Sequence, residues 1–315
     1  MGSRTTNQRM STMTIFKRLA GRAAAFAAGM AVAAASVRAQ SGAPVDWQLG
    51  FQDAATPVMH EITWFHDGLL LPIITVIMAF VLGLLLVCMV RFRKSANPTP
   101  SKTSHNTVLE VAWTVLPILI LVVIAIPSFR LLYFQQDYLY KIEDPELTIK
   151  AIGVQWYWTY EYPDNGDFSF DSYMVPDQDL QPGQPRLLTV DAEVVVPVGK
   201  VVRLIVTADP QGVIHSWAIP AFGVKIDAVP GRLNETWFKV ERAGLYHGQC
   251  SELCGTGHAF MPITVRAVGE DEFDAWVKTA QMAGIGEANR MFASKTDMPA
   301  RADDWTAALN GSAGK

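Results

Sequence analysis

Two cysteines, two histidines and a methionine lie close together near the C-terminal end of the sequence, in the stretch YHGQCSELCGTGHAFMP (246–262). The chain has only 3 cysteines, so the placing of Cys250 and Cys254 beside a histidine and a methionine concentrates soft metal ligands. A disulfide between the two cysteines is one alternative. A zinc site is another, but zinc does not favour methionine. Thiolate, imidazole and thioether together favour copper.

The second cysteine is more than a single electron-transfer copper needs, because such a site takes one cysteine, two histidines and a weak axial methionine. Two thiolates can instead bridge two coppers, each of which then needs one histidine. The stretch supplies Cys250 and Cys254 as bridges, His258 as one terminal ligand and Met261 as a weak ligand. The pattern therefore predicts a dinuclear copper site.

The remaining histidine ligand must come from outside the run that starts at Cys250. His215 precedes a predicted strand and lies far upstream of Cys250, whereas His247 lies three residues before Cys250 on the approaching strand. Copper-binding sandwiches commonly draw one histidine from a remote position. The sequence therefore favours His215, with His247 as the alternative.

Two long uncharged runs precede this region, at Leu69–Val90 and Val111–Phe129. Each can cross a hydrocarbon core, which needs about 20 residues. Two buried helices of a soluble protein are the alternative, but apolarity on all sides over such lengths is rare there. The sequence predicts a transmembrane hairpin with helices at about 67–90 and 110–134.

The N-terminal region and the loop of the hairpin predict which side of the membrane the rest of the chain occupies. Residues 1–39 have the pattern of an export signal cleaved after Ala39, with a short membrane helix as the alternative. The loop 91–109 carries four basic residues and no acid, which places it in the cytoplasm. Segment 40–66 and everything after about residue 135 are then expected outside the cytoplasm of a bacterium, in the periplasm.

The exported region at 136–269 alternates short apolar strands with turn residues. Strands are expected within 147–158, 194–207, 213–220, 235–241 and 261–268. This spacing predicts a β-sandwich or small barrel. After it, residues 270–283 have apolar side chains at helical spacing, and a loose tail is expected from about Gly284 to residue 315. The net charge of -4 argues against a nucleic-acid partner.

The run GQCSELCGTGHAFMPI resembles the dinuclear copper (CuA) loop of cytochrome c oxidase subunit II, and matches the pattern C-x3-C-x3-H-x2-M at every position. The runs GVKIDAVPGRLNETWF and QWYWTYEY and the paired membrane helices are similar to the same family, in the same order over roughly residues 45–280. The resemblance implies a membrane-anchored protein with a two-helix hairpin and an all-β, cupredoxin-like Greek-key sandwich.

The resemblance also implies an activity. Electrons from reduced cytochrome c would be accepted at two copper ions and passed to haem in the catalytic subunit I, for reduction of oxygen to water coupled to proton translocation. Glu252 would offer its backbone carbonyl to one copper and its side chain to a magnesium ion at the contact with subunit I. Subunit III, membrane lipid and a separate cytochrome c are the other implied partners, since no C-x-x-C-H haem motif occurs in this chain.

Two further residues carry roles in the resembled family. Trp156 in QWYWTYEY matches the tryptophan through which electrons are taken up, although a packed core aromatic is the alternative, as expected for Tyr157 and Trp158. Val154 stands where the family commonly has a histidine. Glu110 matches the mouth of a proton channel, and an interfacial carboxylate in contact with water is the alternative.

Four acids lie where the family places residues that steer cytochrome c: Glu161, Asp171, Asp191 and Asp209. Surface acids are usually only solvated, which is the alternative here. A copper-free quinol oxidase subunit II and a copper chaperone are the competing functions. The intact Cys/His/Met set argues against the first, and Trp156 with the Glu252 carboxylate argues against the second. Nitrous oxide reductase brings a second, histidine-rich copper domain, and the chain has 6 histidines in all.

Overall fold

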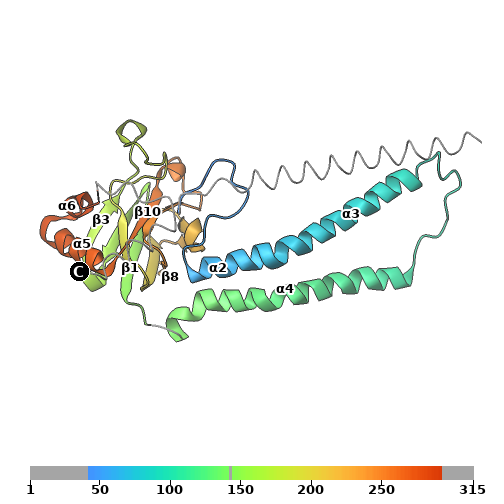
Figure 1. The fold of residues 1–315 in the computed structure, drawn as a ribbon, viewed down its shortest axis with the longest axis horizontal. Coiled ribbons are helices and arrows are strands. Elements are labelled where there is room, and N and C mark those ends of the chain that lie inside the picture. The colour runs from blue at the N-terminus through green and yellow to red at the C-terminus, as the bar shows by residue number, and fades with distance from the viewer. Residues whose placement is uncertain (1–41, 142–143, 293–315) are drawn as a thin grey trace, which may run out of the picture. The chain divides into compact units, whose positions relative to one another are not determined.

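The computed structural model describes residues 42–141 and 144–292 (Figure 1). The expected export signal at 1–39 and residues 293–315 of the expected tail lie outside the described residues. Pro44–Trp47 belong to a separate unit from the remainder of the described chain. The elements below all belong to that remainder.

The first apolar segment is one continuous helical run that begins at Pro57 rather than near residue 67. It consists of α2 (Pro57–Thr63), a π-helical segment η1 (Trp64–Leu70) and α3 (Leu71–Arg91). The early start follows from the cap, because Thr56 Oγ1 accepts a hydrogen bond from the Met59 N–H at 3.2 Å and Pro57 occupies the first helical turn.

The second apolar segment forms α4 (Thr107–Lys141), which also begins before the expected residue 110. Asn106 caps it, since its Oδ1 accepts hydrogen bonds from the N–H groups of Val108 and Leu109 at 3.1 and 3.2 Å. Pro57–Arg91 and Thr107–Gln136 are both long and apolar enough to cross a membrane. Most of their large apolar side chains are exposed in the isolated chain, as the lipid-facing surfaces of a hairpin must be.

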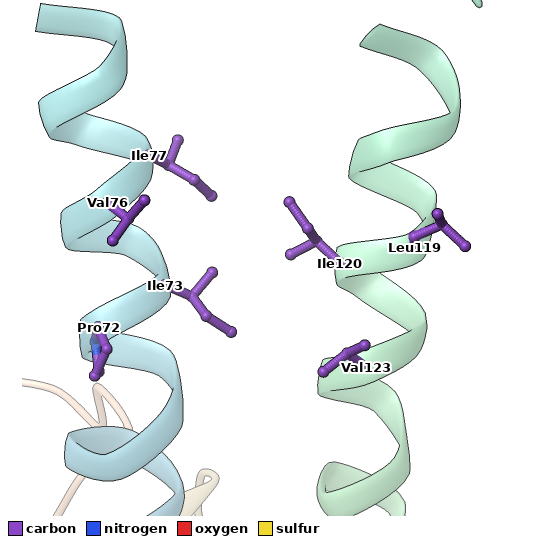
Figure 2. A pocket seen from close by; sticks show the side chains of 7 residues that line it. All are labelled: Pro72, Ile73, Val76, Ile77, Leu119, Ile120 and Val123. Carbon is purple, nitrogen blue, oxygen red and sulfur yellow. The ribbon is translucent and has the colours of Figure 1, made fainter. Parts of the chain in front are cut away.

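A groove of about 430 Å³ lies between the two helices near the middle of each span. Figure 2 shows Ile73 and Ile77 of α3 and Ile120 of α4 pointing into the space between them. Every residue that lines the groove is apolar. The groove is therefore suited to the hydrocarbon core and offers no group for polar chemistry.

The strands form three sheets. The five-stranded sheet has the order β3-β2-β1-β5-β8, the three-stranded sheet β4-β10-β9, and β6 pairs with β7. Their bounds are β1 Leu147–Val154, β2 Tyr157–Tyr162, β3 Phe168–Ser172, β4 Val194–Pro197, β5 Val201–Ala208, β6 His215–Ile219, β7 Val224–Ala228, β8 Asn234–Lys239, β9 Gly244–Gln249 and β10 Pro262–Val268. Short 3-10 helices occupy Pro163–Asn165, Asp177–Asp179, Pro220–Phe222 and His258–Phe260.

One apolar cluster joins these sheets. In β1 and β2 every second residue is buried, so each strand turns one face to the core. Ile149 and Leu204 of the five-stranded sheet, Trp217 of β6 and Ile263 of β10 all belong to this single buried cluster. The predicted all-β sandwich attached to two apolar helices is confirmed.

The end of the described chain differs from the expected loose tail. After α5 (Glu270–Ala283), residues Ile285–Arg290 form a further helix, α6. Ala288 and Phe292 are buried in the main core, and the Trp276 Nε1–H donates to Asn289 Oδ1 at 2.9 Å. Two buried apolar side chains and one partly buried hydrogen bond thus hold a segment whose composition alone predicted no structure.

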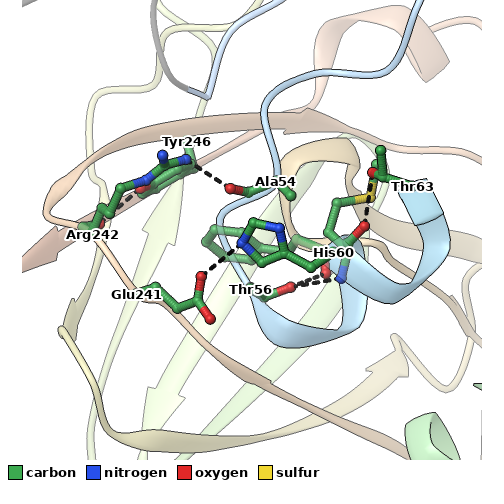
Figure 3. A network of polar contacts seen from close by, with 9 residues as sticks. Ala54, Thr56, His60, Thr63, Glu241, Arg242 and Tyr246 are labelled. Atoms are coloured by element: carbon green, nitrogen blue, oxygen red, sulfur yellow. Dashed lines mark hydrogen bonds and ion pairs between the residues drawn. The ribbon is translucent and has the colours of Figure 1, made fainter. Parts of the chain in front are cut away.

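Polar contacts tie the start of α2 to the turn between β8 and β9 (Figure 3). The Glu241 N–H donates to the Ala55 carbonyl at 2.9 Å, and Arg242 Nη2 donates to the Ala54 carbonyl at 2.7 Å. His60 Nε2 lies 3.0 Å from a Glu241 carboxylate oxygen. The hydrogen bonds to the two backbone carbonyls are the main link, because an exposed pair such as His60–Glu241 contributes at most about 1 kcal/mol to stability.

Candidate metal centre

Five sulfur- and nitrogen-bearing side chains meet at one end of the β-domain, and we call them the ligand cluster: His215, Cys250, Cys254, His258 and Met261. The two Sγ atoms are 3.8 Å apart. His215 Nδ1 lies 3.8 Å from Cys250 Sγ, and His258 Nδ1 lies 3.6 Å from Cys254 Sγ. Met261 Sδ lies 3.6 Å from Cys254 Sγ. Each thiol thus has its own imidazole, and the thioether lies beside one of them.

Two adjacent strands position the loop that carries four of the five. β9 and β10 pair antiparallel, with Gln249 opposite Pro262, so the loop from Cys250 to Met261 leaves and re-enters the sheet at neighbouring points. The fifth residue, His215, opens β6. A hydrogen bond of 2.9 Å from the Ser251 N–H to the Ser216 carbonyl ties the loop to β6. This bond explains how a residue so distant in sequence reaches the thiols.

One buried polar atom of the cluster has no hydrogen-bond partner in the described part of the chain. Cys250 and Cys254 are free thiols in the structure. His215 is fully buried, and its Nε2 has no hydrogen-bond partner among the described residues. Buried polar groups are normally paired. The other ring nitrogen of His215, Nδ1, is the one that faces a thiol, and it is this nitrogen that the ring presents to the cluster.

Burial sets the electrostatics of the cluster. Desolvation, together with the neighbouring Cys250, raises the pKa of the Cys254 thiol to about 12. Desolvation and the nearby His258 lower the pKa of His215. A neutral imidazole has a free lone pair, and a bound cation deprotonates a coordinating thiol outright. The donor set of two thiols, two Nδ1 atoms and one thioether fits copper, which soft ligands select.

His247, the alternative histidine ligand, lies outside the cluster. It is buried on β9, and its Nδ1 is 3.1 Å from the Leu188 carbonyl and 3.3 Å from Thr264 Oγ1. The metal-capable group among the described residues is instead His215, Cys250 and Cys254, whose ligand atoms lie within 4.8 Å of one another. The arrangement thus brings His215, and not His247, to the thiols.

Glu252 offers a backbone oxygen to the same place. Its carbonyl oxygen lies 3.4 Å from Cys250 Sγ, and its side chain is exposed. The carboxylate of Glu252 thus faces solvent, while its backbone carbonyl lies beside a thiol.

Trp156 lies directly on the cysteine loop. Its indole Nε1 donates a hydrogen bond of 2.9 Å to the Cys254 carbonyl, and the side chain is half-buried. A Cβ on Gly257 would lie 2.3 Å from the indole ring, and one on Gly255 would lie 3.0 Å from it. The two glycines allow the ring to pack against bare backbone. The spacing C-G-T-G-H is the sequence signal of this packing.

The four acids expected to steer a partner are dispersed over the five-stranded sheet and its loops. Glu161 pairs with Lys150 at 2.9 Å, and Asp209 accepts from the Gln211 N–H at 2.8 Å. Asp171 and Asp191 are both exposed and both contact Tyr173, at 3.4 Å from its hydroxyl and 2.8 Å from its N–H. Two of the four thus contact the same residue, one at its side-chain hydroxyl and one at its backbone.

Glu110 lies in the first turn of α4, far from the ligand cluster in sequence. Its carboxylate accepts a hydrogen bond of 3.3 Å from the Asn106 N–H. Asn106 in turn caps the N–H groups that follow it. This reciprocal pair resembles a capping box, a role that the sequence analysis did not consider.

Two family models match this chain. The model described as "Cytochrome C oxidase subunit II, periplasmic domain" matches residues 147–268, and "Cytochrome C oxidase subunit II, transmembrane domain" matches residues 44–131.

Individual proteins are similar over most of the chain. A probable cytochrome c oxidase subunit 2 of Rickettsia bellii (strain RML369-C) is 50% identical over 252 residues, which are 80% of this chain and 91% of that protein. Cytochrome c oxidase subunit 2 of Arabidopsis thaliana is 50% identical over 247 residues, which are 77% and 93% of the two chains. The crystal structure of the periplasmic domain of subunit II of cytochrome oxidase of Bradyrhizobium japonicum is 61% identical over 45% of this chain and 97% of that chain, with a TM-score of 0.41.

Proposed function

The chain belongs to the cytochrome c oxidase subunit II family, and on this premise we propose that it takes electrons from reduced cytochrome c at a pair of copper ions and passes them to haem in the catalytic subunit I. Membership makes the chain a membrane protein and one subunit of an oxidoreductase complex of respiratory electron transport. The oxygen chemistry and proton translocation belong to subunit I in this proposal.

The ligand cluster is the observation that carries the proposal. Cys250 and Cys254 would hold the coppers by their thiolates, His215 and His258 would each contribute Nδ1, and Met261 would be a weak ligand. The short separations among these atoms support this assignment. When bound, copper supplies reversible acceptance of one electron.

Glu252 completes the set with its backbone carbonyl, which lies next to Cys250 Sγ. Its exposed carboxylate would bind a magnesium ion at the contact with subunit I. The exposed position of that side chain supports this role, because a hard cation prefers carboxylate oxygens and retained water.

Trp156 couples the donor to the cluster. Its indole is partly accessible on one side and donates to the Cys254 carbonyl on the other, so a single side chain spans the distance between the surface and a ligand residue. Cytochrome c, if it presents a basic face, is steered by Glu161, Asp171, Asp191 and Asp209. Asp171 and Asp191, which both contact Tyr173, are exposed and so available for this steering.

The membrane hairpin anchors the copper domain to the bacterial inner membrane, with the domain in the periplasm. Four basic residues in the loop between α3 and α4 support a cytoplasmic position for that loop. Glu110 at the start of α4 then lies at the cytoplasmic surface, where it passes protons to a path in subunit I. Subunit III and membrane lipid are further partners in the assembly.

An EPR spectrum of the full-length chain in detergent, loaded with copper, tests the central claim. We expect a hyperfine pattern shared between two copper nuclei and two coppers bound per chain. Rapid mixing with reduced cytochrome c should then bleach the copper absorption. A pattern of one isolated copper, or a loaded protein that cytochrome c does not reduce, would exclude the proposed function.

A further inference from the structure

Trp158 connects two members of the ligand cluster that come from distant parts of the chain. It lies on β2 and is fully buried. Its Nε1 donates a hydrogen bond of 3.2 Å to the Met261 carbonyl. Its ring meets the His215 ring edge-on, with centroids 6.1 Å apart and an interplanar angle of 63°. One rigid side chain thus contacts both the remote histidine and the loop methionine.

Gly153 lies directly opposite Trp158, on β1. Opposite residues of an antiparallel pair direct their side chains to the same face, so the missing side chain of Gly153 leaves a space beside Trp158. The His215 ring fills that space. A Cβ on Gly153 would lie 2.9 Å from Cβ, Cγ and Cδ2 of His215, closer than normal van der Waals contact.

From this arrangement we propose that Trp158 and Gly153 are positioning residues, which together fix the His215 imidazole and Met261 relative to the two thiols. The proposal rests on the proposed function in taking His215 and Met261 as copper ligands. It assigns Trp158 a role beyond the core packing that the sequence analysis expected.

The close packing makes the cluster sensitive to both residues. A metal–imidazole bond is only about 2 Å long, so a displacement of a few tenths of an ångström changes ligand geometry. Gly153→Ala must move the His215 ring by such an amount, because the added Cβ would lie against Cβ and Cγ of His215. Trp158→Phe removes the donor to the Met261 carbonyl and opens space beside the same ring. The first variant acts on one ligand and the second on two.

The first arm of the test needs no metal. The full-length chain in detergent micelles is labelled with ¹⁵N at its histidine rings, and the ring signals of metal-free wild type, Gly153→Ala and Trp158→Phe are compared. We expect the His215 signal to shift in both variants while the His247 signal stays. An unchanged His215 signal in Gly153→Ala, which adds one methyl group and opens no cavity, overturns the proposal even if Trp158→Phe does not fold.

The second arm adds copper to the same three proteins. We expect copper affinity to fall about 10- to 100-fold in each variant, the loss typical of residues that orient a metal ligand, and the EPR hyperfine pattern to change. Unaltered affinity and EPR in both variants overturn the proposal. If wild type itself fails to take up a copper pair, the proposed function fails, while the histidine signals still decide whether these two residues position His215.

Two variants separate positioning from general loosening of the core. Trp276→Phe removes another buried indole donor, which bonds Asn289 Oδ1 at 2.9 Å and contacts no member of the cluster. Gly269→Ala adds a Cβ that meets nothing within 4 Å, at a φ of -62°. Both should leave the His215 signal and the copper EPR unchanged. An equal change in Trp276→Phe would overturn the proposal.

Discussion

The ligand cluster and the first turn of α4 use their polar atoms in opposite ways. In the cluster, thiols and imidazoles face each other in a buried space, and His215 Nε2 has no partner among the described residues. In the first turn of α4, the Asn106 side chain caps the helix, and the Glu110 carboxylate accepts a hydrogen bond from the Asn106 N–H. The cluster thus directs metal-binding atoms at one another, whereas the polar groups of the helix turn serve as caps for the backbone.

Because of this difference, the structure supports the assignment of the copper ligands but adds no support for a role of Glu110 in proton uptake. In the cluster, free thiols lie against two imidazole Nδ1 atoms and a thioether, a donor set that favours a soft metal ion. The contact of the Glu110 carboxylate is explained by capping, so the role of Glu110 in proton uptake depends on resemblance alone.

The largest effect is expected at the bridging cysteines. Cys250→Ser or Cys254→Ser should abolish the paired-copper EPR signal and the reduction of the chain by cytochrome c, because a hydroxyl does not replace a bridging thiolate. Cys88→Ser is the matched control, since that thiol lies exposed on α3 and should be dispensable. A paired signal that survives in either cluster variant would remove the dinuclear assignment.

His215 and His247 are both buried in the same domain but should differ in their effect on copper binding. Loss of a residue that only orients a metal ligand lowers metal affinity about 10- to 100-fold. His215→Leu removes a ligand itself and should lower copper affinity by at least as much. His247→Leu should leave copper binding intact and lower the free energy of unfolding by about 1 kcal/mol, through its lost contact with the Leu188 carbonyl. Copper titration and chemical unfolding measure both quantities. Reversed outcomes would make His247 the ligand.

Trp156→Phe should affect electron transfer without affecting the metal. The phenyl ring lacks the donor to the Cys254 carbonyl, so reduction by cytochrome c should slow severely, while the copper EPR spectrum stays normal. Loss of that bond should also lower the free energy of unfolding by about 0.5–1.5 kcal/mol. Stopped-flow reduction measures the rate, with Trp276→Phe as the control. A normal rate would return Trp156 to the class of packed aromatic residues.

The sequence predicts the cluster well where the ligands are close together in the chain. Cys250, Cys254, His258 and Met261 share one loop, so their spacing is enough to identify them as a set. The prediction of His215 depended on the use of a remote histidine by copper sandwiches. The Ser251–Ser216 backbone bond and the packing against Trp158 and Gly153, which position His215, are not visible in the sequence. Gly153 gave no signal, because its contact is with a residue on another sheet.

The helix ends and the C-terminal segment show the same limit. Apolar runs predict the middle of α3 and α4, but their starts depend on the caps Thr56 and Asn106, which lie outside those runs. The helix α6 has few apolar residues, so periodicity missed it. The burial of Ala288 and Phe292 against the rest of the domain stabilises it, which is a tertiary effect that local pattern cannot contain.

A smaller effect is expected at Met261. Met261→Leu preserves the volume of a fully buried side chain, so the loss of stability should stay below about 1.5 kcal/mol. It removes only a weak sulfur ligand, which mainly tunes the reduction potential. Copper should remain bound as a pair, while the potential and the transfer rate shift. Loss of the pair would show that the thioether is an essential ligand.

Substitution of Glu110 should have no effect on the copper centre. A helix rises about 1.5 Å per residue, so a residue at the cytoplasmic start of α4 is separated from the periplasmic side by the hydrocarbon core of about 30 Å. Electron uptake at the cluster cannot depend on it directly. Proton uptake can, because a carboxylate at that surface is able to collect protons and hand them to a path in subunit I.

Two substitutions at Glu110 separate proton uptake from helix capping. Glu110→Gln keeps an oxygen that accepts from the Asn106 N–H, as glutamine does in a capping box, but it no longer carries a proton. Glu110→Ala loses both the acceptor and the acid, and the lost bond should cost about 0.5–1.5 kcal/mol of helix stability. In the assembled oxidase, proton uptake through Glu110 predicts slower oxygen consumption in both variants, with normal copper reduction by cytochrome c. Capping alone predicts normal turnover in Glu110→Gln, and that result would leave the first turn of α4 a structural device, in full contrast to the ligand cluster.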